Sequence, residues 1–124
     1  MLEYDQRKIK YVKNALEDYY FIMRLMATKL KMLVSYENIY GNNNPRINEE
    51  IAQLDREIDI LSARTEKVDA FLKKLETEDR IMIYELHKKT DGREHYEDYC
   101  FKVGMSRSTL HRHINKIILE NWEE

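Results

Sequence analysis

Hydrogen-bonding and cationic side chains recur along residues 106–119 at a spacing that suits one face of a helix. These side chains belong to Arg107, Ser108, His111, Arg112 and Asn115. Side chains of these types can reach base edges in a DNA groove or the phosphates beside it. We therefore expect this helix to read double-stranded DNA, and we include Ser106 and Thr109, at its start, in the candidate surface.

The local charge supports this expectation. From residue 99 to residue 119 the chain has no Asp or Glu, and its basic residues are Lys102, Arg107, Arg112 and Lys116. The whole chain, by contrast, has a net charge of −2. A basic segment in an acidic protein favours a polyanionic partner, whereas chance clustering on a solvated face is the alternative. Lys102 and Lys116 are expected to neutralise phosphates.

The residues before this helix have the pattern of a tight corner between two helices. Cys100 is small enough to lie where the helices touch, and Gly104 can take the positive φ that such a turn requires. Val103 and Met105 are expected to seal the corner with apolar contacts. Ser106 is a suitable N-cap for the second helix.

The helix after the corner has an apolar face opposite its polar one. Leu110, Ile114 and either Ile117 or Ile118 recur at helical spacing. The sequence therefore predicts a helix-turn-helix whose recognition helix spans about 106–119.

Two longer segments precede this module. The first, about 5–40, has apolar residues at alternating steps of three and four: Ile9, Val12, Leu16, Tyr19, Met23, Met26, Leu30 and Leu33. The second, about 49–75, repeats the alternation after a break at 41–45 that is rich in Gly, Asn and Pro. This pattern predicts an antiparallel helical hairpin, with Asn48 as N-cap of its second helix.

A short third helix is expected to begin after Thr77 as N-cap and to end at Thr90-Asp91-Gly92. The predicted fold is thus all-α, with a hairpin over 1–75 and a DNA-binding module over 76–124. The apolar stripe of the hairpin is wider than one partner helix covers. We therefore expect the protein to form a homo-oligomer through the hairpin, or the hairpin to contact another protein.

Composition narrows the function classes. Only three glycines and one proline are present, which favours long helices, and no apolar run is long enough to span a membrane. The polar, acidic start is unlike a secretory signal, and one cysteine allows no internal disulfide, so a cytoplasmic location is expected. His111 and His113 lie too far apart around a helix to share a metal. We expect no metal, no cofactor and no enzymatic activity.

The segment 103–112, Val-Gly-Met-Ser-Arg-Ser-Thr-Leu-His-Arg, resembles the turn and recognition helix of sigma-factor region 4. The resemblance covers residues 77–119. The helical front half also resembles, in architecture, the ArpU/RinA-like late transcription regulators of phages of Gram-positive bacteria. Cys100 and Phe101 depart from the group's usual alanine and polar residue. Acidic Glu94, Glu97 and Asp98 are a second departure.

The resemblance implies a phage or prophage transcription regulator that binds promoter DNA and contacts RNA polymerase. Two other functions fit the same pattern. Phage small terminase subunits also combine a helix-turn-helix with helical hairpins, and they assemble into rings. An adaptor that binds a sigma factor or RNA polymerase, rather than DNA, is the third hypothesis.

Overall fold

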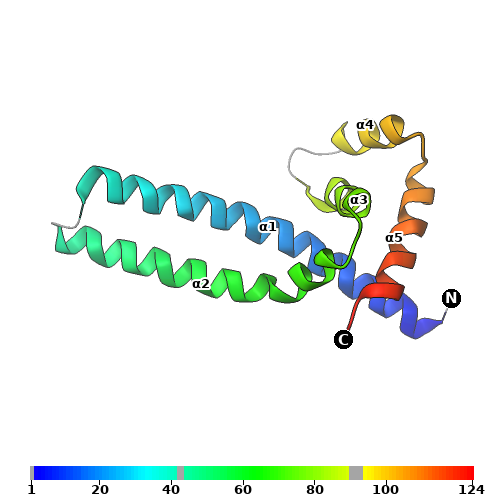
Figure 1. The fold of residues 1–124 in the computed structure, drawn as a ribbon, viewed down its shortest axis with the longest axis horizontal. Helices are drawn as coiled ribbons and strands as arrows, with labels where there is room; N and C mark the ends of the chain where they lie inside the picture. Colours follow the sequence, from blue (N-terminus) through cyan, green and yellow to red (C-terminus); the bar gives the residue numbers. More distant parts are fainter. Residues whose placement is uncertain (1, 42–43, 90–93) are drawn as a thin grey trace. The chain divides into compact units, whose positions relative to one another are not determined.

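The computed structural model describes residues 2–41, 44–89 and 94–124, and within these ranges it contains five α-helices and no strand (Figure 1). The helices are α1 (Glu3–Tyr40), α2 (Pro45–Lys73), α3 (Thr77–His87), α4 (Glu94–Val103) and α5 (Arg107–Asn121). The prediction of an all-α protein is confirmed. The predicted end of the third helix at 90–92 lies outside the described residues. None of the helices in these ranges is both long enough and apolar enough to cross a membrane.

The chain forms two compact units that do not coincide with the expected boundary at residue 75. One unit combines Met1–Tyr20 with Val68–Glu124, and the other is Phe21–Lys67. The difference arises because the first turns of α1 share a core with the C-terminal helices. Val12 and Leu16 are buried in the same cluster as Leu110. The long helices α1 and α2 therefore each contribute to both units.

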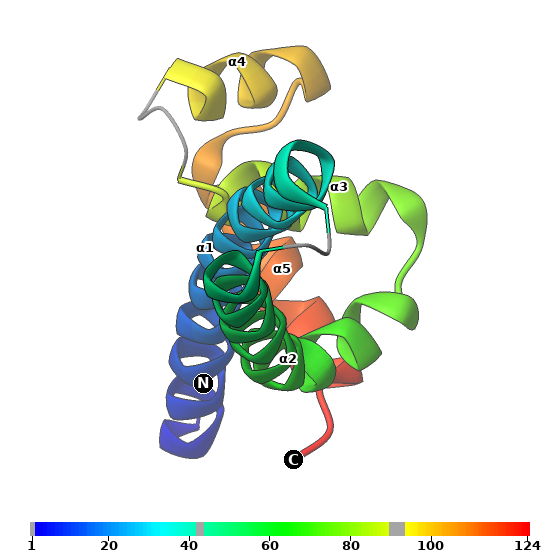
Figure 2. The ribbon, with the colours of Figure 1, turned by 90° about the vertical axis from the view of Figure 1, so that its left-hand side faces the viewer.

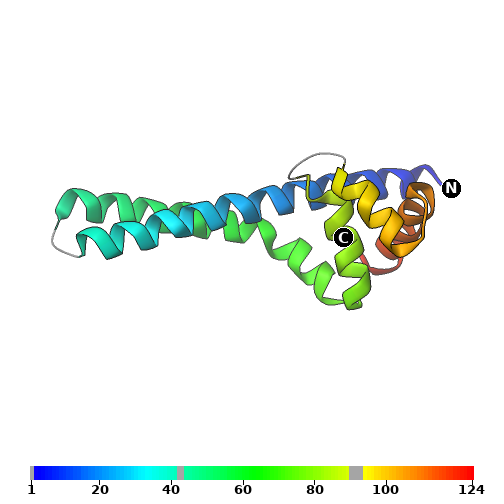
Figure 3. The same cartoon turned by 90° about the horizontal axis from the view of Figure 1, so that it is seen from above.

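The unit Phe21–Lys67 consists of two antiparallel helical arms, one from α1 and one from α2 (Figures 1 and 3). Ile22 of α1 and Leu54 and Leu61 of α2 are its buried apolar side chains. An ion pair joins the arms, with Lys29 Nζ 2.7 Å from a carboxylate oxygen of Glu57. The exposed face of α1 in this unit remains rich in apolar side chains.

The connection between the arms differs from its prediction in one detail. Gly41 has a φ of +60°, which suits the end of α1. The side chain of Asn44 accepts hydrogen bonds from the backbone N–H groups of Arg46 and Ile47, at 3.1 and 3.2 Å. Asn44 is therefore the N-cap of α2, and Pro45 takes the first helical position, where its missing N–H costs nothing. The prediction that Asn48 caps this helix was wrong.

The other unit has a larger apolar core. Its members come from α1, the end of α2, α3 and α5, with Tyr99 and Cys100 of α4 packed at its edge. Helices α3, α4 and α5 contact one another pairwise (Figure 2). The hydroxyl of Tyr19 donates a 2.6 Å hydrogen bond to Asp69, which joins α1 to α2. At the start of α3, Glu76 occupies the N-cap position without a side-chain bond, so the prediction of Thr77 as the cap was wrong.

Candidate nucleic-acid interface

The corner between α4 and α5 has a defined hydrogen-bond pattern. Gly104 has a φ of +69°, as predicted. The N–H of Gly104 donates to the carbonyl of Phe101 at 3.2 Å, and the N–H of Met105 donates to the carbonyl of Cys100 at 3.1 Å. This pair of bonds is the Schellman arrangement that ends a helix with a left-handed residue. The side chain of Ser106 then accepts from the N–H of Thr109 at 3.2 Å, which confirms Ser106 as the N-cap of α5.

Helix α5 separates an apolar side from a polar one. Its buried residues are Leu110, Ile114, Ile117 and Ile118. Arg107, Ser108, Arg112 and Lys116 are exposed. Because residues 108, 112 and 116 follow one another at four-residue steps, they form a single row along the helix. These three predicted residues are thus brought together on one accessible face.

The Arg112 side chain is held near the start of α5. Its guanidinium donates to the hydroxyl of Thr109 at 3.2 Å, and that hydroxyl lies 2.9 Å from the hydroxyl of Ser106. Lys116 lies one turn farther along, 4.0 Å from Glu120 and exposed. An ion pair of this length between exposed groups contributes little to stability, so the Lys116 ammonium can leave Glu120 and bind another anion. A shallow depression of about 310 Å³ lies between Arg112, Asn115, Lys116, Leu119 and Glu120.

His111 lies differently from its prediction. We expected it on the exposed face, but its side chain is half-buried against α1, and its Nδ1 lies 3.2 Å from Lys13 Nζ. An ammonium group can only donate, so Nδ1 accepts and His111 is neutral in this arrangement. Burial lowers the pKa of His111 to about 4, and the nearby positive charges of Lys13, His87 and Arg107 add to the effect. The physical reason is that the first turns of α1 pack beside α5, a contact that the predicted domain boundary separated.

Asn115 is also half-buried on the side of α5 that faces α1. Its Oδ1 atom is buried and has no hydrogen-bond partner among the described residues. The side chain lines both the depression beside Arg112 and a second groove beside α1. An unsatisfied buried oxygen is costly, which makes Asn115 the residue of this surface most in need of an incoming donor.

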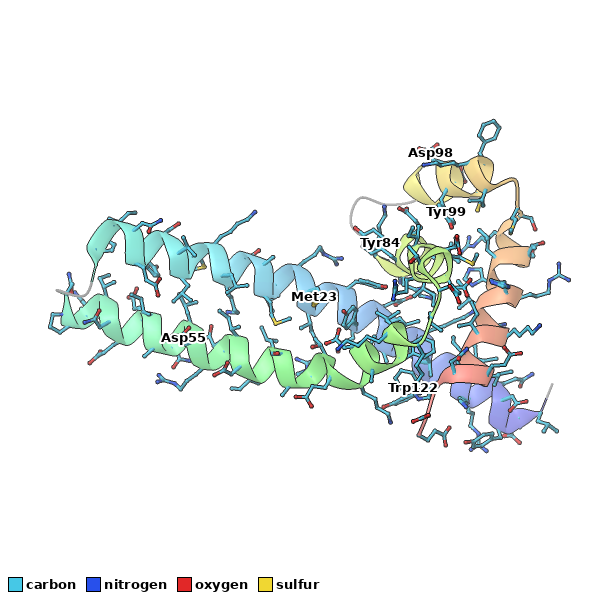
Figure 4. All side chains as sticks on the ribbon, viewed as in Figure 1. Met23, Asp55, Tyr84, Asp98, Tyr99 and Trp122 are labelled. Atoms are coloured by element: carbon cyan, nitrogen blue, oxygen red, sulfur yellow. The ribbon has the colours of Figure 1, made fainter. Side chains whose placement is uncertain are left out.

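The residues at the end of α4 are more exposed than predicted. Lys102 is exposed, as a phosphate contact requires. Val103 and Met105, however, are 37% and 41% exposed, so the prediction that they seal the corner was wrong. Tyr99 and Cys100 pack against the core instead. Figure 4 shows Tyr99 directed toward α3 and Asp98 on the outer side of α4.

Phe101 is 91% exposed, which is unusual for an aromatic side chain. It follows Cys100 directly, so the half-buried position of Cys100 turns Phe101 outward. Together with Val103 and Met105 it places three apolar side chains at the corner.

Two lysines of α1 were missed as members of this surface. Lys10 and Lys13 line a groove of about 420 Å³ whose other lining residues are Gln6, Ile9, Asn14, Glu17 and Asn115. A signal for this row was present in the sequence, because Gln6, Lys10, Lys13 and Glu17 recur at steps of four and three beside the apolar seam. The sequence did not indicate, however, that α5 would pack next to it.

Within the described ranges, no three His, Cys, Asp or Glu side chains are grouped so that they could hold a metal ion. Comparison with known proteins found no matching family model and no significantly similar curated protein or solved structure.

Proposed function

We propose that α4, the corner at Gly104 and α5 form a helix-turn-helix that binds double-stranded DNA, with α5 as the recognition helix. In this proposal Ser108 and Arg112 read base edges in the major groove, while Lys102, Arg107 and Lys116 hold phosphates. Ser106 and Thr109 orient Arg112, and Asn115 extends the surface toward α1. His111 acts as a support between α5 and α1 rather than as a base-reading residue.

The observation that carries this proposal is the row Ser108, Arg112 and Lys116 on the exposed side of α5. The corner fixes the start of the helix, and the buried apolar side fixes its rotation. A helix with such an exposed polar row, free of acidic residues from 107 to 119, has the chemistry that major-groove recognition uses.

The biological role that best fits this module is sequence-specific transcription control of the phage or prophage type. The unit formed by Phe21–Lys67 would then act as a helical hairpin that holds a second copy of the chain or contacts RNA polymerase.

One experiment tests the proposal directly. Duplexes selected by the full chain from a random pool should converge on one motif, and binding to that motif should exceed binding to a scrambled duplex at the same salt concentration. Retention of no duplex at low salt would overturn the proposal.

A second candidate function is favoured by one observation, the exposure of Phe101 beside Val103 and Met105. Exposed aromatic side chains are enriched where proteins bind proteins. In this alternative the corner docks on a polymerase or sigma-factor surface, and the module is an adaptor. Phe101→Ser would then abolish capture of the purified polymerase, whereas it would leave DNA selection unchanged if α5 reads DNA.

A further inference from the structure

We infer that the first turns of α1 form a second DNA-contacting element. In this arrangement Lys10 and Lys13 bind the DNA phosphate backbone at the edge of the major groove that α5 enters. This inference rests on the proposed function of α5. It assigns a role to a segment that the sequence pattern had placed in a separate hairpin.

The geometry places the two elements next to each other. Lys13 Nζ lies 3.2 Å from His111 Nδ1, so the side chains of α1 and α5 are in direct contact. Lys10 and Lys13 line the groove together with Asn115, which also lines the depression beside Arg112 and Lys116. Asn115 thus joins the two hollows into one surface that runs from the exposed row of α5 to α1.

The charges of this groove are unbalanced in favour of cations. Neither Lys10 nor Lys13 forms an ion pair within the part of the chain that the structure describes. Among the described residues that line the groove, Glu17 is the one with a carboxylate, and Lys89 Nζ lies 3.1 Å from it. The polar neighbour of Lys13 is His111, which is neutral. An ammonium group with only a neutral acceptor gains from an approaching anion.

The partial burial of Lys13 also favours the approach of an anion. The pKa of Lys13 is lowered because its side chain is partly removed from water, so its charged form lacks the solvation that an exposed lysine has. A phosphate oxygen would restore a charged partner.

The length of the row favours a nucleic-acid backbone over a single small anion. Gln6 and Lys13 are separated by seven residue steps of α1, with Lys10 between them, which corresponds to about 10 Å at 1.5 Å per residue. One strand of B-DNA presents a phosphate every 3.4 Å of axis, so such a row is long enough to reach more than one phosphate. The groove is shallow and open, as contact with a continuous strand requires.

The test compares two lysines of the same helix. Lys10→Gln removes one cation of the groove, and Lys8→Gln is its matched control because Lys8 lies about 200° around the helix axis from Lys10. Both variants should keep the helical circular-dichroism signal of the parent, since Lys10 is exposed and Lys8 makes no ion pair in the described ranges. Binding to the selected duplex and to a scrambled duplex is then measured over a series of salt concentrations.

If the inference is correct, Lys10→Gln weakens binding to both duplexes alike and lowers the slope of log K against log salt by about 0.9. Lys8→Gln leaves the slope unchanged. Ethylation interference locates the phosphates that Lys10 contacts. Phosphates whose ethylation weakens binding of the parent chain but not of Lys10→Gln should lie on one strand, beside the bases read by Arg112.

Two results would overturn the inference, and they are distinguishable. If the parent chain selects a motif but Lys10→Gln and Lys13→Gln both keep the parental slope, α1 does not touch the backbone and the function of α5 stands. If the parent chain retains no duplex at low salt, the proposed function fails and the role of α1 fails with it.

Discussion

At the scale of single residues, the proposed function assigns recognition of DNA bases to Arg112 and anchoring on the phosphates to Lys116. Arg112 presents a planar fork of donors that matches the two acceptors of a guanine, whereas Lys116 carries a point charge. Arg112→Ala should therefore cost about 1–3 kcal/mol on the selected site and relax preference at one or two base pairs. Lys116→Ala should weaken selected and scrambled sites equally and lower the salt slope by about one. Titrations of both variants with the selected and the scrambled duplex, at several salt concentrations, measure these effects.

A backbone contact by Arg112, instead of a base contact, would give a different result. If Arg112→Ala weakened both duplexes equally and left base preference intact, α5 would lie on the backbone, and another segment would do the reading.

His111 and His87 make stability depend on pH in a predictable direction. Burial is the largest cause that lowers the pKa of both side chains, to about 4 for His111. The unfolded chain, with histidines near their usual value of about 6.5, binds more protons than the folded one below that value. Stability should therefore fall as the pH is lowered from about 7 to about 5. His111→Gln should flatten this dependence, because glutamine does not titrate and can still accept from Lys13.

The measurement is the urea midpoint of the helical circular-dichroism signal at each pH. A midpoint that rises on acidification, or a His111→Gln variant with the parental slope, would contradict the placement of His111 beside Lys13.

At the scale of elements, the corner before α5 depends on one backbone conformation. Gly104 has a φ of +69°, and a Cβ built there would meet no atom within 4 Å. A substitution is therefore opposed by backbone strain and not by crowding. Gly104→Val should destabilise the unit by about 1–3 kcal/mol, whereas Gly104→Asn, which tolerates the left-handed region, should cost less. Equal midpoints of urea unfolding for the two variants would show that backbone strain does not determine the loss of stability.

Among the elements, features that depend on neighbouring residues could be predicted from the sequence, and features that depend on distant residues could not. Gly104 and Ser106 were predicted correctly because turns and caps depend on residues within a few positions of one another. The helical segments followed from the steps of three and four. The burial of His111 was not predicted, because it depends on Lys13, a residue 98 positions away along the chain. The prediction of the α2 cap was wrong for a local reason. Asn44 and Asn48 are equally good caps by type, and a Pro after Asn44 is compatible both with a break in the chain and with the first helical position that it occupies.

At the scale of the whole molecule, the exposed apolar side chains of α1 within Phe21–Lys67 predict self-association. Met23, Leu30 and Val34 are exposed, and with Ala27 they continue at steps of four and three, which is the pattern of a helix seam. The full chain should therefore sediment as a dimer or larger species at micromolar concentration. Leu30→Glu combined with Val34→Glu should reduce its mass to that of a monomer, because buried like charges oppose pairing.

Ile60→Glu is the control for this prediction, since Ile60 is exposed on α2 and stands alone there. Loss of association in Ile60→Glu but not in the double variant would place the contact on α2. A parent chain that remains a monomer at high concentration would remove the basis for an oligomer altogether. A closed ring of many copies would instead favour the packaging hypothesis.

The setting of Trp122 has a consequence for measuring the two units separately. Trp122 is the one tryptophan of the chain, is 5% exposed, and has the rings of Phe71 and Tyr11 at centroid distances of 5.3 and 6.3 Å. Its indole emission therefore reports on the unit that contains α5, while residues 21–67 contribute no tryptophan signal. A shift of the emission to longer wavelength at a denaturant concentration different from that of the helical signal would reveal two unfolding steps. The protein thus contains an optical label for one of its two halves.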